Sequence, residues 1–286
     1  MTDNKKILRE KLKENDFFTL PGIYDCLGAK IAESLGFDAL YLSGGALSLA
    51  ALGRPDSGYL NLTDLRMVLE RVLSTVDIPV ITDTDNSFGN AMHAADTAKT
   101  LERMGVCGLQ IDDNILPQPK PENDKEVISW DLLAPKLEAI RKSTSDDFVM
   151  ILRTIIGKTE GIEKAVERAS KAADLGVDYV FIEGFNSVEE MEYATIESRA
   201  NLMVNLNENT FAATVDIEKV RSMGFKIGFF PISTIHVAAK AMYDVLSLLK
   251  EKGTTMEMKS QMIPYSDLMR LYNFYDDVEK YSKLYK

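Results

Sequence analysis

The chain is poor in the residues that build disulfide scaffolds and sulfur or histidine metal sites. Its 286 residues include two cysteines, Cys26 and Cys107, and two histidines, His93 and His236. Two cysteines are too few for a disulfide framework or a cysteine zinc site, and they fit a reducing cytoplasm. Any metal is therefore expected to be bound by oxygen ligands, which favours Mg²⁺ or Mn²⁺.

Long apolar runs and a positive net charge are also missing. No apolar run reaches the ~20 residues that span a bilayer, and the first fifteen residues are charged and lack the apolar core of a signal peptide. The net charge of −11 argues against nucleic acids and anionic membranes as partners. It does not oppose a small anionic substrate, because a bound cation can invert the local field. We therefore expect a cytoplasmic protein that binds a small molecule.

Short apolar runs alternate with helical patterns along the whole chain. Eight runs have the length and composition of buried strands, and each precedes a helical segment. The predicted strands cover residues 17–20, 38–42, 78–83, 106–111, 148–153, 179–183, 201–205 and 226–230, the first being closed by Pro21-Gly22. Eight such units in about 250 residues predict an α/β fold, a (β/α)₈ TIM barrel.

The chain is expected to form a single domain with a helical extension. Residues 1–255 contain the barrel, and residues 256–286 form the extension, which is unusually aromatic for a surface segment. Because the barrel is complete without it, the extension packs either on its own barrel or on a partner subunit.

The stretch IPVITDTDNSFG, residues 78–89, carries the strongest local signal of a functional site. The predicted strand ends in Asp83 and Asp85, and residues two apart on an extended strand point to the same side. Two like charges that face one spot repel each other unless a cation or a shared proton relieves them. The alternative is a strand end that is only exposed to solvent and has no function. We favour a functional site.

The carboxyl ends of all eight strands meet at one mouth in such a barrel. Collecting the predicted ends brings together Ser43, Gly44, Gly45, Asp83, Asp85, Asp112, Asp113, Arg153, Glu183 and Asn205. The carboxylates need a cation in order to coexist. An arginine beside them suits a substrate carboxylate, and small residues let backbone N–H groups approach an anion. This set predicts a Mg²⁺ ion that polarises a carbonyl or enolate oxygen while Arg153 holds a carboxylate.

Several motifs resemble the isocitrate lyase/phosphoenolpyruvate mutase superfamily. They are, in order, PGIYDCLGAKIAESLGFDALYLSGG, RPDSGYLNLTD, DTDNSFGN, GLQIDD, ILRT, FIEG, MVNLNE and GFFPIS, and the final helices look most like those of 2-methylisocitrate lyases. The resemblance implies a Mg²⁺-dependent barrel that makes or breaks C–C or P–C bonds next to a 2-oxo acid, through an enolpyruvate-like species. It also implies a homotetramer whose C-terminal helices swap between neighbouring subunits.

The same resemblance implies a role for each matching residue. Asp85 stands at the position of the direct metal ligand, and the residues that hold the metal's waters are Asp56, Asp83, Asp112 and Glu183. The substrate-binding positions are Tyr41, Ser43, Gly44, Gly45, Arg153 and Asn205. We take Arg153 and Asp56 as catalytic candidates as well.

The segment LPQPKPENDKE after the fourth strand departs from the pattern of the superfamily. Its lyases carry K-[KR]-C-G-H there, and that cysteine is their catalytic acid/base. Here the segment has neither cysteine nor histidine, and we expect Cys26 and Cys107 in the core. Lys120 and Asn123 are the polar candidates that remain, and of these we select Lys120.

A missing acid argues against isocitrate-type cleavage, because general acid catalysis contributes roughly 10²–10⁴-fold. Decarboxylation is less demanding, since solvent can supply the proton later, and the superfamily's oxaloacetate decarboxylases also lack the cysteine. We therefore predict a Mg²⁺-dependent carbon–carbon lyase that decarboxylates an oxaloacetate-like acid. Two alternatives stay open: phosphonate P–C chemistry of the phosphoenolpyruvate mutase or phosphonopyruvate hydrolase type, and a non-catalytic barrel that binds an oxo acid.

Overall fold

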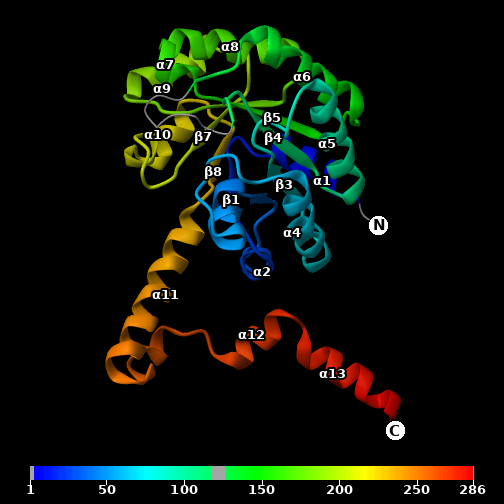
Figure 1. The fold of residues 1–286 in the computed structure, drawn as a ribbon, viewed down its shortest axis with the longest axis vertical. Helices are drawn as coiled ribbons and strands as arrows, with labels where there is room; N and C mark the ends of the chain where they lie inside the picture. The colour runs from blue at the N-terminus through cyan, green and yellow to red at the C-terminus, as the bar shows by residue number, and fades with distance from the viewer. Residues whose placement is uncertain (1–2, 117–125, 286) are drawn as a thin grey trace.

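Eight parallel strands close into a barrel in the computed structural model, which describes residues 3–116 and 126–285. The strands follow sequence order around the barrel, and β1 pairs with β8 (Figure 1). They are β1 (Phe18–Ile23), β2 (Leu40–Leu42), β3 (Val80–Asp83), β4 (Gly108–Asp112), β5 (Val149–Thr154), β6 (Tyr179–Ile182), β7 (Leu202–Asn205) and β8 (Ile227–Phe230). The TIM barrel expected from the sequence is confirmed.

Helices follow the strands and cover the outside of the barrel (Figure 1). They are α2 (Cys26–Ser34), α3 (Gly44–Leu47), α4 (Leu62–Thr75), α5 (Ala91–Met104), α6 (Trp130–Ser143), α7 (Ile156–Glu160), α8 (Ile162–Asp174), α9 (Val188–Glu197) and α10 (Ile217–Ser222). A π-helical turn, Ser48–Leu52, continues α3, and a 3-10 turn, Ala212–Thr214, precedes α10. No helix within the described ranges is long and apolar enough to cross a membrane.

The barrel interior is apolar and is closed at its amino-terminal end by α1 (Asn4–Glu14). Leu8 and Leu12 of this helix belong to the same buried cluster as the inward-facing residues Ile81 and Ile151. Arg9 fixes the helix in place, because its Nη1 donates to Asp178 Oδ1 at 2.5 Å. With this end plugged, ligands have access from the carboxyl ends of the strands.

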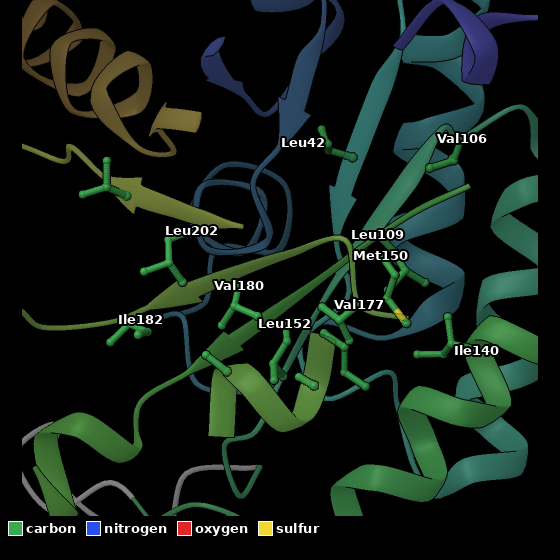
Figure 2. Packing of buried hydrophobic residues seen from close by; sticks show 14 of the residues in the cluster. Leu42, Val106, Leu109, Ile140, Met150, Leu152, Val177, Val180, Ile182 and Leu202 are labelled. Atoms are coloured by element: carbon green, nitrogen blue, oxygen red, sulfur yellow. The ribbon is translucent and has the colours of Figure 1, made fainter. Parts of the chain in front are cut away.

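The second part of the core lies between the strands and the helices. Leu109, Met150, Leu152 and Val180 point outward from neighbouring strands and pack in one cluster with Ile140 of α6 (Figure 2). Burying each of these side chains contributes roughly 1.5–3 kcal/mol relative to leaving it in water. The strands are therefore apolar on both faces, as a parallel barrel requires.

The first strand is longer than predicted. It does not end at Leu20 but continues through Pro21 and Gly22 to Ile23. A Cβ atom on Gly22 would lie 2.4 Å from the carbonyl oxygen of Pro231, so the chain leaving β8 passes too close for any side chain. The glycine here serves a close approach within the barrel instead of a turn.

The C-terminal helices leave the barrel. After β8, α11 (Ser233–Lys252) runs away from the strands, and α12 (Tyr265–Leu271) and α13 (Phe274–Ser282) continue beyond it (Figure 1). Within α11 only Ile235 is buried, whereas the apolar side chains of Val237, Tyr243 and Leu246 are exposed. The last strand ends at Phe230, so α11 lies between the strands and the extension predicted for residues 256–286.

Candidate active site

The polar side chains at the open end occupy inward-facing positions of their strands. Ile151 and Ile81 belong to the interior cluster, and side chains alternate along a strand, so Arg153 and Asp83 two residues further on face the same side. The inward positions at this end are held by Tyr41, Asp83, Gln110, Asp112, Arg153, Glu183 and Asn205. The same alternation that builds the apolar interior therefore gathers the predicted polar residues at the mouth.

Arg153 lies between two carboxylates. Its Nη1 donates to Asp112 Oδ2 at 2.6 Å, and its Nη2 donates to Glu183 Oε2 at 3.3 Å. Lys158 in α7 donates to the other oxygen of Glu183, at 3.4 Å. Burial raises the pKa of Glu183, but the charges of Arg153 and Lys158 outweigh it and hold that pKa below its usual value. Glu183 is therefore ionised at neutral pH.

Asp112 is buried among hydrogen-bond donors. Besides Arg153, it accepts hydrogen bonds from Gln110 Nε2 at 3.0 Å and from Asn114 Nδ2 at 3.3 Å. Burial still raises its pKa to about 7, because the charge of Arg153 offsets only part of the desolvation. Asp112 can thus change its protonation state near neutral pH.

Asp83 and Asp85 come together, although not along one extended strand as predicted. The strand β3 ends at Asp83, and Asp85 has a left-handed φ of 48°. In this turn the Asp85 N–H group donates to Asp83 Oδ1 at 3.1 Å. Burial, and then the charges of Asp83, Asp112 and Asp56, raise the pKa of Asp85 to about 9. The carboxylates of Asp83 and Asp85 therefore repel each other as expected, but it is the turn after β3 that brings them together.

The turn after β3 is strained and held in place. Asp85, Ser87 and Phe88 all have positive φ angles, which cost energy in residues other than glycine. Lys136, a buried lysine of α6, donates to the backbone carbonyl of Asn86 at 2.8 Å. Such a conformation persists only where its surroundings hold it, and Lys136 supplies one of these contacts.

The residues after β2 leave room for carboxylates. A Cβ on Gly44 would lie 3.0 Å from Asp83 Oδ2, and one on Gly45 would lie 2.8 Å from Asp56 Oδ2. The side-chain oxygen of Ser43 caps the short helix α3, which was not predicted, by accepting from an amide of its first turn at 3.3 Å. The structure therefore places Asp56 beside Gly45, and its role at the metal's waters stays a prediction.

Tyr41 and Asn205 complete the set of predicted residues. Tyr41 is buried below the mouth, with its ring edge-on to Phe229 at 5.4 Å between centroids. Burial first and then the charge of Asp83 raise the pKa of its phenol well above the usual value. Asn205 is half-buried at the end of β7, and its side-chain oxygen accepts from the N–H of Asn207 at 2.9 Å. Tyr41 is therefore part of the floor, and Asn205 part of the wall.

Asp113 is not part of this mouth, so that expectation is wrong. Being next to Asp112, it points to the opposite side of the strand, toward the helices. It accepts from Thr154 Oγ1 at 2.5 Å, from Arg168 Nη1 at 2.8 Å and from the Ile155 N–H at 3.0 Å. Through these contacts Asp113 ties β4 to β5 and α8.

Both cysteines lie outside the mouth. Cys107 precedes β4 and belongs to the interior cluster, and burial raises the pKa of its thiol to about 11. Cys26 begins α2 and packs against the layer between helices and strands. Since these are the only cysteines of the chain, no cysteine faces the site.

The predicted candidates Lys120 and Asn123 lie outside the described residues. On either side of this gap, Asn114 and Val127 form an antiparallel β-bridge. The role of Lys120 therefore stays a prediction.

Two residues at the mouth were missed by the sequence analysis. Gln110 precedes Asp112 by two positions in the run GLQID, so strand alternation alone could have placed both on one face. Lys158 belongs to α7, a helix that the sequence pattern did not predict, and no signal in the sequence points to it.

The polar groups at the mouth fit a hydrated divalent cation. Within residues 3–116 and 126–285, no three His, Cys, Asp or Glu side chains are placed to hold a metal ion together. Asp83, Asp85 and Asp112 nevertheless repel one another, and Mg²⁺ commonly keeps several waters while bonding few carboxylates. Gln110 Oε1 and Arg153 Nε are buried without a described partner, although such atoms normally have one.

Comparisons with known proteins identify the family of the chain. A family model described as phosphoenolpyruvate phosphomutase matches residues 8–250. The chain is 33% identical to 2-methylisocitrate lyase of Aeropyrum pernix over 271 residues, 94% of this chain and 87% of that protein. It is 31% identical to 2,3-dimethylmalate lyase of Eubacterium barkeri over 269 residues, 92% of this chain and 93% of the relative.

A solved structure of oxaloacetate acetylhydrolase with the inhibitor 3,3-difluorooxalacetate is similar over almost the whole chain. Its TM-score is 0.90 at 29% sequence identity, covering 99% of this chain and 97% of that one. Fold, motifs and family model thus agree, and the chain belongs to the phosphoenolpyruvate mutase/isocitrate lyase superfamily.

Proposed function

We propose that the protein is a Mg²⁺-dependent carbon–carbon lyase that decarboxylates an oxaloacetate-like 2-oxo acid. The observation that carries the proposal is Arg153, half-buried between Asp112 and Glu183 beside the repelling pair Asp83 and Asp85. Relatives named as lyases of 2-methylisocitrate and of 2,3-dimethylmalate support a lyase.

Asp85 is the residue proposed to bind the metal directly. Its raised pKa of about 9 reflects burial and three neighbouring carboxylates, a surrounding that a divalent cation would relieve. The residues proposed to hold the waters of the ion are Asp56, Asp83, Asp112 and Glu183. When bound, the cation would supply a Lewis acid beside a 2-oxo group.

The protein's own residues are proposed to bind and orient the substrate. Gly44 and Gly45, at the start of α3, lie against the carboxylates of Asp83 and Asp56, and their backbone N–H groups are proposed to bind a substrate carboxylate. Arg153 is held at two carboxylates, so its charge is fixed where negative charge would develop on the substrate. The buried ring of Tyr41 excludes water from below.

The positions of the cysteines favour decarboxylation over cleavage that needs a positioned acid. Cys107 and Cys26 are both remote from the mouth, so neither can protonate a departing fragment. Loss of CO₂ needs no proton donor in the bond-breaking step, and solvent can supply the proton afterwards.

A substrate panel tests this proposal. Oxaloacetate, 2-methylisocitrate, isocitrate, 2,3-dimethylmalate and phosphonopyruvate are each incubated with Mg²⁺ and with EDTA, and the products are identified. The proposal predicts Mg²⁺-dependent pyruvate and CO₂ from oxaloacetate. Glyoxylate release, phosphate release followed by ³¹P NMR, or oxalate and acetate from oxaloacetate would each assign a different reaction. Stabilisation by oxalate without any turnover would indicate a binding protein.

We also propose that a second copy of the chain covers the groove beside α11, as in a homotetramer with swapped C-terminal helices. The groove is apolar. It is lined by Leu27 and Ile31 of α2, by Leu35 directly after that helix, and by Val237, Ala238 and Ala241 of α11. A barrel needs an eighth helix over β8 and β1, and α11 instead leads away from its own strands (Figure 1). A partner's C-terminal helix would fill that place.

Light scattering after size exclusion tests the assembly. We expect a tetramer for the unmodified protein and a smaller species for Leu246→Asp, because Leu246 is 62% exposed on α11 in the single chain. Lys250→Asp on the same helix is the control and should leave the mass unchanged. A monomeric unmodified protein would contradict the proposal.

A further inference from the structure

A row of alternating charges runs from the base of the mouth to its rim. Asp112, Arg153, Glu183 and Lys158 follow one another, and each is joined to the next by an ion pair. The side chain of Asp112 is 2% exposed, whereas that of Lys158 is 39% exposed. The row therefore begins at the proposed metal-binding carboxylates and ends in an ammonium group that solvent and ligands can reach.

The position of Lys158 is set by the backbone as well as by Glu183. A Cβ atom on Gly184 would lie 2.2 Å from Cε of Lys158, so the lysine stem occupies the space that a side chain at residue 184 would fill. Gly184 has a φ of +88°, which favours glycine independently. Together with the 3.4 Å contact to Glu183, this contact aims the ammonium along the wall of the mouth.

Lys158 has hydrogen-bonding capacity to spare. An ammonium carries three donors, and within the described chain its one acceptor is Glu183 Oε1. Glu183 already shares its charge with Arg153, whose other partner is Asp112. The cation at the rim is therefore only partly neutralised, and an anionic ligand group could bind it without displacing a protein contact.

We propose that Lys158 binds the second carboxylate of the substrate, so that the site prefers dicarboxylates to monocarboxylates. This inference rests on the proposed function, in which one carboxylate and its neighbouring oxygen bind deep in the mouth. A monocarboxylate bound there has no charged group directed to the rim. A four-carbon dicarboxylate carries its second charge toward Lys158.

Two ligands that differ only in the second carboxylate test the inference. L-Malate and L-lactate share a 2-hydroxy acid head, and neither loses CO₂ without an oxidant, so their binding is measured at equilibrium by calorimetry with Mg²⁺ present. We expect malate to bind about tenfold more tightly than lactate. This factor is at the lower end of the range for a hydrogen bond between charged groups, because Lys158 is partly exposed to solvent.

Variants of Lys158 separate recognition from structure. In Lys158→Met the malate preference should fall to about onefold while lactate binding is unchanged, and Lys158→Arg should retain most of the preference. The control is Lys164→Met in α8, which removes the same charge from a lysine paired with Glu167 at 2.8 Å on the outer surface. Lys158→Gln serves as the second variant if the Met variant has a lowered melting temperature.

Several outcomes would overturn the inference. These are an unmodified protein that binds malate no better than lactate, one that binds neither, and a Lys158→Met variant that retains the preference or weakens both ligands equally. If Lys158→Met loses the malate preference but the unmodified protein does not decarboxylate oxaloacetate, the proposed reaction is refuted and the dicarboxylate subsite stands. If Lys158→Met decarboxylates oxaloacetate with an unchanged KM, the subsite is refuted and the proposed reaction stands.

Discussion

The neighbouring carboxylates of Asp112 and Asp113 point to opposite sides of the barrel wall and bind different arginines. Asp112 faces inward and accepts from Arg153 at 2.6 Å, and Asp113 faces outward and accepts from Arg168 at 2.8 Å. Asp112 thus belongs to the candidate site, whereas the adjacent Asp113 stabilises the fold.

Asparagine at position 113 should mainly lower stability, whereas asparagine at position 112 should mainly lower turnover. Asp113→Asn leaves the guanidinium of Arg168, which is 8% exposed, without its buried counter-ion and should cost about 3 kcal/mol of unfolding free energy. Asp112→Asn removes a carboxylate whose pKa is already about 7, so it should cost under about 1 kcal/mol and mainly reduce turnover. Urea denaturation and oxaloacetate turnover measure the two effects, and equal destabilisation by both variants would contradict the assignment.

Arg153→Lys should reduce kcat/KM by about 100-fold without unfolding the protein. A lysine keeps the positive charge, but its single ammonium cannot contact Asp112 and Glu183 in the two-pronged geometry that fixes the guanidinium. Arg199→Lys, at an exposed pair with Asp174, is the matched control and should be neutral. Turnover within threefold of the unmodified protein would show that Arg153 is only structural.

Binding of Mg²⁺ should release protons, and its affinity should rise with pH. Burial and neighbouring charges raise the pKa of Asp85 to about 9, and burial raises that of Asp112 to about 7, so at pH 7 the metal-free site retains protons that a cation must displace. Calorimetry in buffers of different ionisation enthalpy counts the released protons between pH 6 and pH 9. A metal affinity that is flat across this range would contradict the predicted protonation of the site.

The same shifts determine the sign of the pH effect on stability. Between its ordinary value of 3.8 and about 9, the raised pKa of Asp85 makes the folded state bind more protons than the unfolded one. The unfolding free energy of the metal-free protein should therefore fall as pH rises through that window. Denaturation midpoints in EDTA at pH 6 and pH 8.5 measure the effect, and Asp85→Asn should flatten the dependence.

A cysteine-free protein should remain active. Cys107 lies in the barrel interior and Cys26 in the helix layer, so replacing both with alanine should leave kcat within about twofold. The buried Cys107 should account for most of the expected loss of about 1 kcal/mol in stability. A 100-fold loss of kcat in a folded variant would mean that a thiol takes part after all.

Much of this site follows from strand periodicity, which the sequence displays. All eight strands were recognised because each is a short apolar run, and alternation then orients Asp83, Arg153 and Glu183 inward. Asp113 was misplaced because it was assigned to the mouth by proximity to Asp112 instead of by alternation. Gln110 could have been found by the same rule.

The features that the sequence did not reveal depend on backbone conformation or on distant contacts. The positive φ of Asp85 arises from a turn whose shape depends on surrounding contacts such as that from Lys136. Lys158 reaches the mouth only because Gly184, 26 positions along the chain, leaves space for its stem. Neither relationship has a periodic pattern, so neither was predictable without the fold.

The most direct test of the proposed function is pyruvate release from oxaloacetate, measured for the unmodified protein with Mg²⁺, with EDTA, and for Asp85→Asn with Mg²⁺. A protein-free sample with Mg²⁺ corrects for the spontaneous loss of CO₂. We predict turnover well above this background that EDTA abolishes and that falls at least 100-fold in the variant. Turnover that survives both EDTA and the loss of Asp85, or no turnover above background, would contradict the account.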